Sequence, residues 1–146
     1  MSTITKTLPA ASSIKAIATI VVRSLFGLIY LVFGLNFFLH FIPMPPPPAT
    51  PGAAESFTGG LFQAGYFFPM LKGIEVLLGG FLLLNFFTPL SLVILAPISI
   101  NILLFHLFLA PAGIGMSILI IVLHAYLFWA YRKSYKTILD PKVLLS

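Results

Sequence analysis

A pair of opposite charges lies inside one of the most apolar stretches of the chain. Lys72 and Glu75 stand three residues apart within residues 66–87 (YFFPMLKGIEVLLGGFLLLNFF), which contain no other charged residue. A charged side chain near the centre of a membrane helix costs about 2.5–3.5 kcal/mol on insertion scales, so such residues are functional candidates by default. Glu75 is therefore our candidate for a catalytic or proton-exchanging group.

The sequence is compatible with two kinds of partner for Glu75. Lys72 and Glu75 can pair with each other, because residues three apart are neighbours on the surface of a helix. Alternatively, Lys72 extends to the lipid headgroups while Glu75 points inward and meets His40 or His106. In the first arrangement the two residues form a structural ion pair, and in the second Glu75 belongs to a functional site.

Other polar side chains are expected at a similar depth. Asn36 and His40 are four residues apart and share one helical face, and Asn101 and His106 follow in a later apolar stretch. The asparagines can instead join neighbouring helices by hydrogen bonds, and His40 can be an interfacial residue at a helix end. We predict a ligand-binding pocket in the outer half of the protein, lined by Asn36, His40, Lys72, Glu75, Asn101 and His106.

The residue types argue against a metal site. Asn101 and His106 are about 140° apart on a helical wheel, so they do not face one point. The chain has no cysteine and no His-x-x-x-His or Glu-x-x-His pair, which removes the usual ligand sets. We interpret His124 as a packed core residue. Heme is disfavoured because the three histidines of the sequence offer at most one pair of axial ligands. A quinone is still compatible with the sequence as a cofactor.

The composition places these side chains in a membrane protein. Hydrophobic residues make up 60% of the chain and charged residues 8%, with a mean hydropathy of +1.11. Soluble domains carry about a quarter charged residues, so this chain cannot cover itself in water. The net charge of +5 comes without a basic stripe interleaved with aromatic residues. The lipid bilayer is therefore an expected partner, and nucleic acid is not.

Four apolar stretches are long enough to cross the hydrocarbon, which takes about 20 helical residues. Short links at 88–89 and 110–112 make neighbouring helices antiparallel. The predicted fold is therefore all-α, an up-down four-helix membrane bundle in which residues 1–146 form a single domain. The predicted segments are spans at about 13–41, 68–87, 90–109 and 113–131, an outer loop at 42–67 and a cytoplasmic tail at 132–146.

The basic residues predict the orientation. Apart from Lys72, every Lys and Arg lies before or at the start of the first span, or after the last one. The positive-inside rule then places both termini in the cytoplasm.

The outer loop has two predicted parts. Residues 42–52 (IPMPPPPATPG) are rich in proline, which favours an extended and stiff segment. After them, Phe57, Leu61 and Ala64 repeat with helical spacing, and Gly65 is placed to end a helix. We predict a short amphipathic helix that lies on the outer leaflet or folds over the mouth of the bundle.

Paired glycines indicate close helix packing. Gly27 and Gly34 share a face of the first span, and Gly73 and Gly80 share a face of the second. Such spacings let helix backbones approach closely, either within the bundle or in a homo-oligomer.

Four stretches carry a family resemblance: 27–46 (GLIYLVFGLNFFLHFIPMPP), 65–84 (GYFFPMLKGIEVLLGGFLLL), 96–113 (APISINILLFHLFLAPAG) and 126–136 (YLFWAYRKSYK). In this order they resemble the DoxX-like family of small bacterial membrane proteins, over about residues 23–136. The resemblance implies a four-helix protein of the bacterial inner membrane. Its wider superfamily includes a subunit of thiosulfate:quinone oxidoreductase, and other members serve maturation or cargo roles.

Three functions follow as hypotheses. The first is a subunit of, or accessory to, a quinone-linked membrane oxidoreductase, with a redox subunit as its partner. The second is a non-catalytic assembly or interaction factor. The third is a small proton-linked transporter or channel. An independent enzyme is not predicted, because the sequence contains no catalytic motif of its own.

Overall fold

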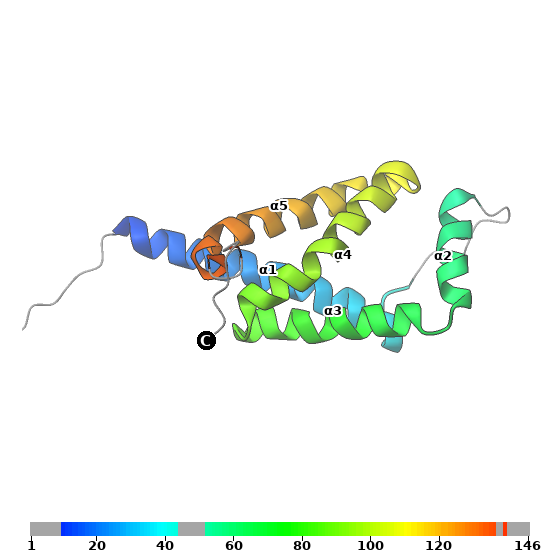
Figure 1. The fold of residues 1–146 in the computed structure, drawn as a ribbon, viewed down its shortest axis with the longest axis horizontal. Helices are drawn as coiled ribbons and strands as arrows, with labels where there is room; N and C mark the ends of the chain where they lie inside the picture. The colour runs from blue at the N-terminus through cyan, green and yellow to red at the C-terminus, as the bar shows by residue number, and fades with distance from the viewer. Residues whose placement is uncertain (1–9, 44–51, 137–138, 140–146) are drawn as a thin grey trace, which may run out of the picture.

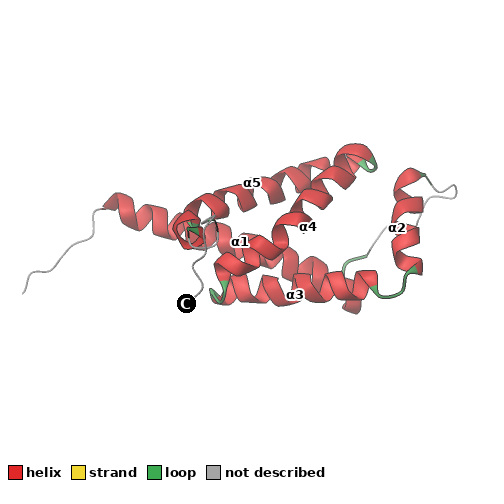
Figure 2. Ribbon diagram, viewed as in Figure 1, coloured by secondary structure: helices red, strands yellow, loops and turns green. Residues whose placement is uncertain are grey.

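The computed structural model describes residues 10–43, 52–136 and 139. Over these residues the chain is helical and contains no β-strand (Figure 2). The helices are α1 (Ala10–Leu39), α2 (Ala53–Gln63), α3 (Phe67–Leu84), α4 (Thr88–Phe108), α5 (Ile114–Ala130) and the 3-10 helices η1 (Pro111–Gly113) and η2 (Arg132–Tyr135).

Four of the helices are long and apolar enough to cross a membrane: α1 from Ser13 onward, α3, α4, and α5 together with η1. Their direction alternates along the chain (Figure 1), and α1 and α4 each pack against both α3 and α5. This confirms the predicted all-α bundle of four long apolar helices and fits a multi-pass membrane protein. The proline-rich part of the outer loop falls mainly on residues 44–51, outside the described residues.

The short helix α2 forms where the amphipathic spacing predicts it. It lies roughly across one end of the bundle, which we call the α2 end; α1 begins and α5 ends at the opposite end (Figure 1). The helix runs through Gly59 and Gly60, and Gly65 takes a positive φ of 73° just after it. Aromatic contacts hold it in place, with Phe57 6.1 Å from Phe105 and Phe62 4.5 Å from Phe68 between ring centroids.

The turn between α3 and α4 differs from the prediction. Residues 88–89 are not a link, because Thr88 and Pro89 form the first turn of α4. Proline is well accepted there, since the first N–H groups of a helix have no partner within it. The chain reverses instead at Asn85 and Phe87, which both take left-handed backbone conformations, and α3 therefore ends at Leu84, before the predicted residue 87.

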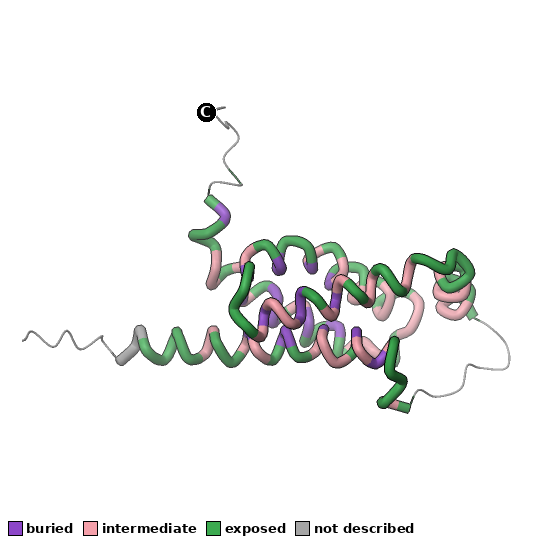
Figure 3. The backbone as a smooth tube through the Cα atoms, turned by 90° about the horizontal axis from the view of Figure 1, so that it is seen from below, coloured by how far each residue is buried: buried purple, intermediate pink, exposed green. Residues whose placement is uncertain are grey.

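The core forms where the four long helices face one another (Figure 3). Large apolar side chains on their other faces, such as Leu28, Leu77 and Ile100, are exposed, as expected for contact with lipid. The fully or nearly fully buried apolar residues of the cluster are Phe26, Tyr30, Leu78, Leu82, Leu92, Leu95, Ile120, Leu123 and Leu127.

Candidate functional site

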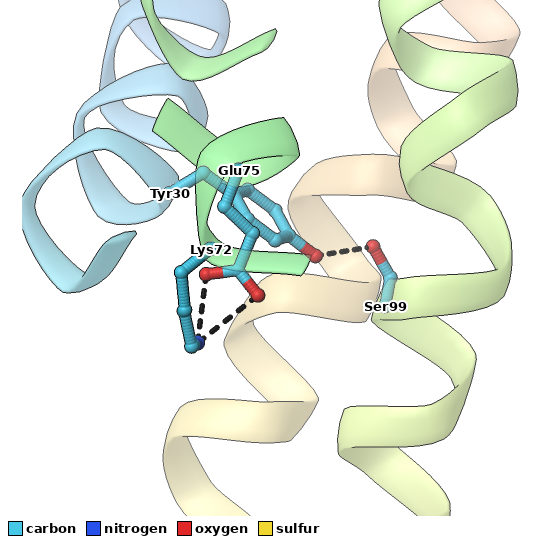
Figure 4. Close-up of polar contacts among 4 residues, drawn as sticks. All are labelled: Tyr30, Lys72, Glu75 and Ser99. Carbon is cyan, nitrogen blue, oxygen red and sulfur yellow. Dashed lines mark hydrogen bonds and ion pairs between the residues drawn. The ribbon is translucent and has the colours of Figure 1, made fainter. Parts of the chain in front are cut away.

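Lys72 and Glu75 form an ion pair on α3 (Figure 4). The Lys72 Nζ donates to both carboxylate oxygens of Glu75, at 3.0 Å to Oε1 and 2.8 Å to Oε2. The Glu75 side chain is 3% exposed, whereas that of Lys72 is 23% exposed. Of the two arrangements that the sequence left open, the structure contains the pairing along one helix. A buried carboxylate depends on such a partner, since removing it leaves an uncompensated charge.

Two cavities meet at this ion pair. The first, the bundle cavity, has a volume of about 220 Å³ and is also lined by Ile29, Tyr30, Phe33, Met116 and Ile120. The second, the α2 cavity, has a volume of about 170 Å³, and its lining includes Phe57, Leu61, Phe68, Asn101 and Phe105. Both cavities are lined by Lys72, Glu75, Ile102 and His106. The charged pair and His106 therefore belong to the wall that the two cavities share.

His106 is held in one orientation. Its Nδ1 lies 2.9 Å from the carbonyl oxygen of Ala110, and a carbonyl only accepts hydrogen bonds, so Nδ1 carries the proton. In the neutral ring this assignment leaves Nε2 as an acceptor. The ring also packs directly on Gly113, where any Cβ would collide with it. His106 therefore brings a defined hydrogen-bond acceptor to the region of both cavities.

Asn36 and His40 serve the end of α1 and do not line either cavity. Asn36 is buried, but its Oδ1 accepts the backbone N–H of Ile42 at 2.6 Å and its Nδ2 donates to the Ile42 carbonyl at 3.4 Å. His40 is exposed and takes a left-handed φ of 53° just after the helix. The chain turns back beyond Leu39, and Asn36 satisfies the backbone of that turn instead of facing Glu75.

The remaining predicted pocket residues come together. Lys72, Glu75, Asn101 and His106 all line the α2 cavity, although Asn101 is exposed. Asn101 thus lies at the margin of the site. The structure brings together four of the six predicted residues.

A buried hydrogen-bond chain links three helices beside the bundle cavity. Tyr30 Oη on α1 lies 2.7 Å from Ser99 Oγ on α4 (Figure 4), and Ser99 Oγ lies 2.7 Å from His124 Nδ1 on α5. His124 Nε2 lies 3.0 Å from the carbonyl oxygen of Leu92. Sequence reasoning missed the roles of Tyr30 and Ser99. The available signal was that polar side chains inside membrane helices need partners.

The chemistry available here is proton exchange and hydrogen bonding. A carboxylate, an ammonium group and an imidazole acceptor stand beside apolar and aromatic walls, which suits a small amphipathic ligand. Among the described residues, no group of three or more His, Cys, Asp or Glu side chains is placed to hold a metal ion.

Comparison with known proteins finds no family model, no curated protein and no solved structure that matches the chain. The geometry of the two cavities and the residues between them is therefore what indicates the function.

Proposed function

We propose that this protein is a DoxX-like subunit of, or accessory to, a quinone-linked redox system, and that it binds a quinone head group beside the Lys72–Glu75 pair. The observation that carries this proposal is the shared wall of the two cavities. There a buried carboxylate, its ammonium partner and His106 lie next to apolar and aromatic side chains.

The polar groups match both redox states of a quinone. An oxidised head group carries carbonyl oxygens that only accept, and the Lys72 ammonium group supplies donors for them. A reduced head group carries hydroxyl groups that also donate, and the Glu75 carboxylate and the His106 Nε2 supply acceptors. The aromatic walls formed by Phe33, Phe68 and other side chains suit the flat ring.

The proposed location is the bacterial inner membrane, with both termini in the cytoplasm. Basic residues gather at the end opposite α2, where Lys15 and Arg23 belong to α1 and the η2 segment adds Arg132 and Lys133. Arg132 also lies over the Trp129 ring, 4.5 Å from its centroid, a pairing suited to the interface. The cavities then lie in the outer half of the bilayer.

Quinone titration of the purified protein in lipid nanodiscs tests the proposal. A water-soluble short-chain ubiquinol analogue, kept reduced, should bind the wild type, and Glu75→Gln should weaken its binding by about tenfold or more, since a hydrogen bond from a quinol hydroxyl to a charged group is lost. Glu55→Gln is the matched control, because Gly52 N–H donates to Glu55 at the start of α2 and glutamine can keep that cap. Absence of binding to the wild type rejects the proposal.

A second candidate is a non-catalytic assembly or interaction factor. The open face of α3 favours it, because a Cβ added at Gly73 or Gly80 would meet nothing within 4 Å. Such a face suits close approach by a helix of a partner subunit or of a second copy. Photo-crosslinking from Leu77, which lies between these glycines and is exposed, should capture one dominant protein partner. Crosslinks to lipid alone contradict this candidate.

A further inference from the structure

We propose that His124 is a buried proton-binding site, and that Tyr30 and Ser99 connect it to the bundle cavity. The proposal does not depend on the identity of the ligand, because any acid in the cavity that is stronger than imidazolium, including a hydronium ion, can donate the proton. It assigns a role to a polar chain that the quinone site does not use. All three side chains are buried.

When His124 is neutral, the positions of the hydrogens along the Tyr30–Ser99–His124 hydrogen-bond chain follow from the atoms that can only accept. The Leu92 carbonyl only accepts, so His124 Nε2 carries a hydrogen and donates to it over 3.0 Å. In the neutral ring Nδ1 then has a free lone pair, which accepts the hydroxyl hydrogen of Ser99 over 2.7 Å. Ser99 Oγ in turn accepts the hydrogen of Tyr30 over 2.7 Å. Every donor in this state has a partner.

The protonated state is equally well satisfied. Ser99 Oγ also lies 3.0 Å from the carbonyl oxygen of Leu95 on its own helix. When Nδ1 carries a hydrogen, it donates to Ser99 Oγ, and the Ser99 hydroxyl turns to Leu95. Tyr30 still donates to Ser99. The core therefore holds partners for both forms of His124, which an ordinary packed histidine does not require.

A proton passes from the bundle cavity to His124 by a sequence of hydrogen shifts along the three side chains. An acid in the bundle cavity gives its proton to Tyr30 Oη, while the hydrogen of Tyr30 passes to Ser99 Oγ and that of Ser99 passes to His124 Nδ1. The acid is left as its conjugate base, and the imidazole becomes imidazolium. Rotation of the two hydroxyl groups then restores the Tyr30-to-Ser99 bond and directs Ser99 to Leu95.

The polar partners of His124 are Ser99 and the Leu92 carbonyl, and a third cavity of about 170 Å³, whose other lining side chains are apolar, borders both Ser99 and the His124 ring. The Phe26 and Phe128 rings lie 4.9 Å and 5.6 Å from its ring between centroids. The buried ionisable side chains on the elements packed around it are Arg23 and Tyr30 of α1, Glu75 of α3 with its partner Lys72, and Tyr135 of η2. Of these, Tyr30 is the group that reaches His124, through one serine hydroxyl.

Solid-state NMR of the full-length protein in nanodiscs, with ¹⁵N-labelled histidine, tests the site. The His124 signals are assigned by their loss in His124→Gln. We expect a neutral ring with the hydrogen on Nε2 at high pH and a doubly protonated ring at lower pH. Ser99→Ala removes the acceptor for Nδ1–H and should lower the proton affinity of His124 by about tenfold or more.

Ser117→Ala is the matched control, because Ser117 is another buried serine, whose hydroxyl donates to the Ile114 carbonyl at 2.8 Å. It should leave the titration of His124 unchanged. A wild-type ring that holds its hydrogen on Nδ1, or that never takes up a second proton between pH 4 and 9, overturns the proposal. Once His124→Gln has assigned the signals, both measurements are made on the wild-type protein. An unchanged titration in Ser99→Ala overturns it as well.

The route is tested separately by kinetics. After a pH jump, time-resolved infrared spectroscopy follows the appearance of the imidazolium band. Tyr30→Phe keeps the ring but removes the hydroxyl, so protonation of His124 should slow by about tenfold or more. An unchanged rate shows that protons reach His124 by another path and rejects the connection to the bundle cavity. This result is independent of quinone binding.

Discussion

Gly27 of α1 and Gly79 of α3 pack directly against each other. A Cβ added at Gly79 would lie 2.7 Å from the Leu31 backbone nitrogen and 2.8 Å from the Gly27 carbonyl oxygen. One added at Gly27 would lie 2.9 Å from the Gly79 carbonyl oxygen. The two backbones therefore touch at this level, and this contact fixes α3, with Glu75 one turn away, against α1.

Gly79→Ala should destabilise the bundle, because the methyl group would meet backbone atoms that cannot move alone. Overpacking of this kind costs about 1–3 kcal/mol. Unfolding in a graded denaturing detergent mixture measures the loss. The neighbouring Gly80→Ala is the control, since a Cβ there meets nothing within 4 Å; it should be neutral or slightly stabilising. Equal losses in both variants contradict the close contact.

The Lys72–Glu75 pair should respond unequally to loss of either partner. Lys72→Met leaves a buried carboxylate without its counter-charge and should cost about 3–5 kcal/mol of stability. Glu75→Gln should cost less, because the Lys72 side chain is partly exposed and can turn toward water or headgroups. The same unfolding assay measures both variants.

The double variant Lys72→Met, Glu75→Gln completes a double-mutant cycle with these two single variants. It should recover much of the stability that Lys72→Met loses, since no charge is then left in the cavity wall. A double variant that is as unstable as the sum of the two single variants shows that the side chains do not interact.

Gly113→Ala should release His106. The added methyl group would occupy the place of the imidazole ring, so the ring must move and lose its hydrogen bond to Ala110. In ¹⁵N spectra the His106 ring should change from one tautomer, with hydrogen on Nδ1, to a mixture. Gly115→Ala is the control, as its Cβ meets nothing within 4 Å. A single unchanged tautomer in Gly113→Ala contradicts the positioning role.

Much of the fold could be predicted from local sequence. The four spans follow from hydropathy, and Gly65 marks the end of α2 because a left-handed residue is needed there. The ion pair also follows from a spacing of three residues. Gly79 was missed in favour of Gly80, since both lie on α3 and only the position of α1 decides which glycine is covered.

The site was less predictable because its contacts depend on where the helices end and cross. Asn36 shares a helical face with His40, yet the chain turns beyond Leu39 and draws the Asn36 amide to Ile42. Tyr30 and Ser99 are 69 positions apart, and no spacing rule connects residues on different helices. Sequence periodicity defines the face of each helix, whereas the pairing of faces is set by packing.

Tyr135, just beyond the last span, should keep its proton to unusually high pH. Tyr135 is buried, and its ring stacks on Phe128 at 4.7 Å between centroids. Its hydroxyl donates to the Pro89 carbonyl oxygen at 3.3 Å. Burial, together with the neighbouring Tyr131, raises the pKa of Tyr135 from 10.0 to about 12. Between pH 10 and 12 the folded protein thus keeps this proton, whereas the unfolded chain loses it. The free energy of unfolding should therefore be constant in this respect below pH 10 and should fall between pH 10 and 12.

Ultraviolet titration at the tyrosinate band measures this effect as the difference between the wild type and Tyr135→Phe. The difference should show one phenol that ionises near pH 12, and the fall in stability between pH 10 and 12 should be smaller in the variant. Because Tyr135→Phe keeps the stacked ring and loses only the hydroxyl, the bundle should remain folded at neutral pH. A difference titration centred near pH 10 shows that water reaches the hydroxyl, and then η2 does not pack over the start of α4 as the structure describes.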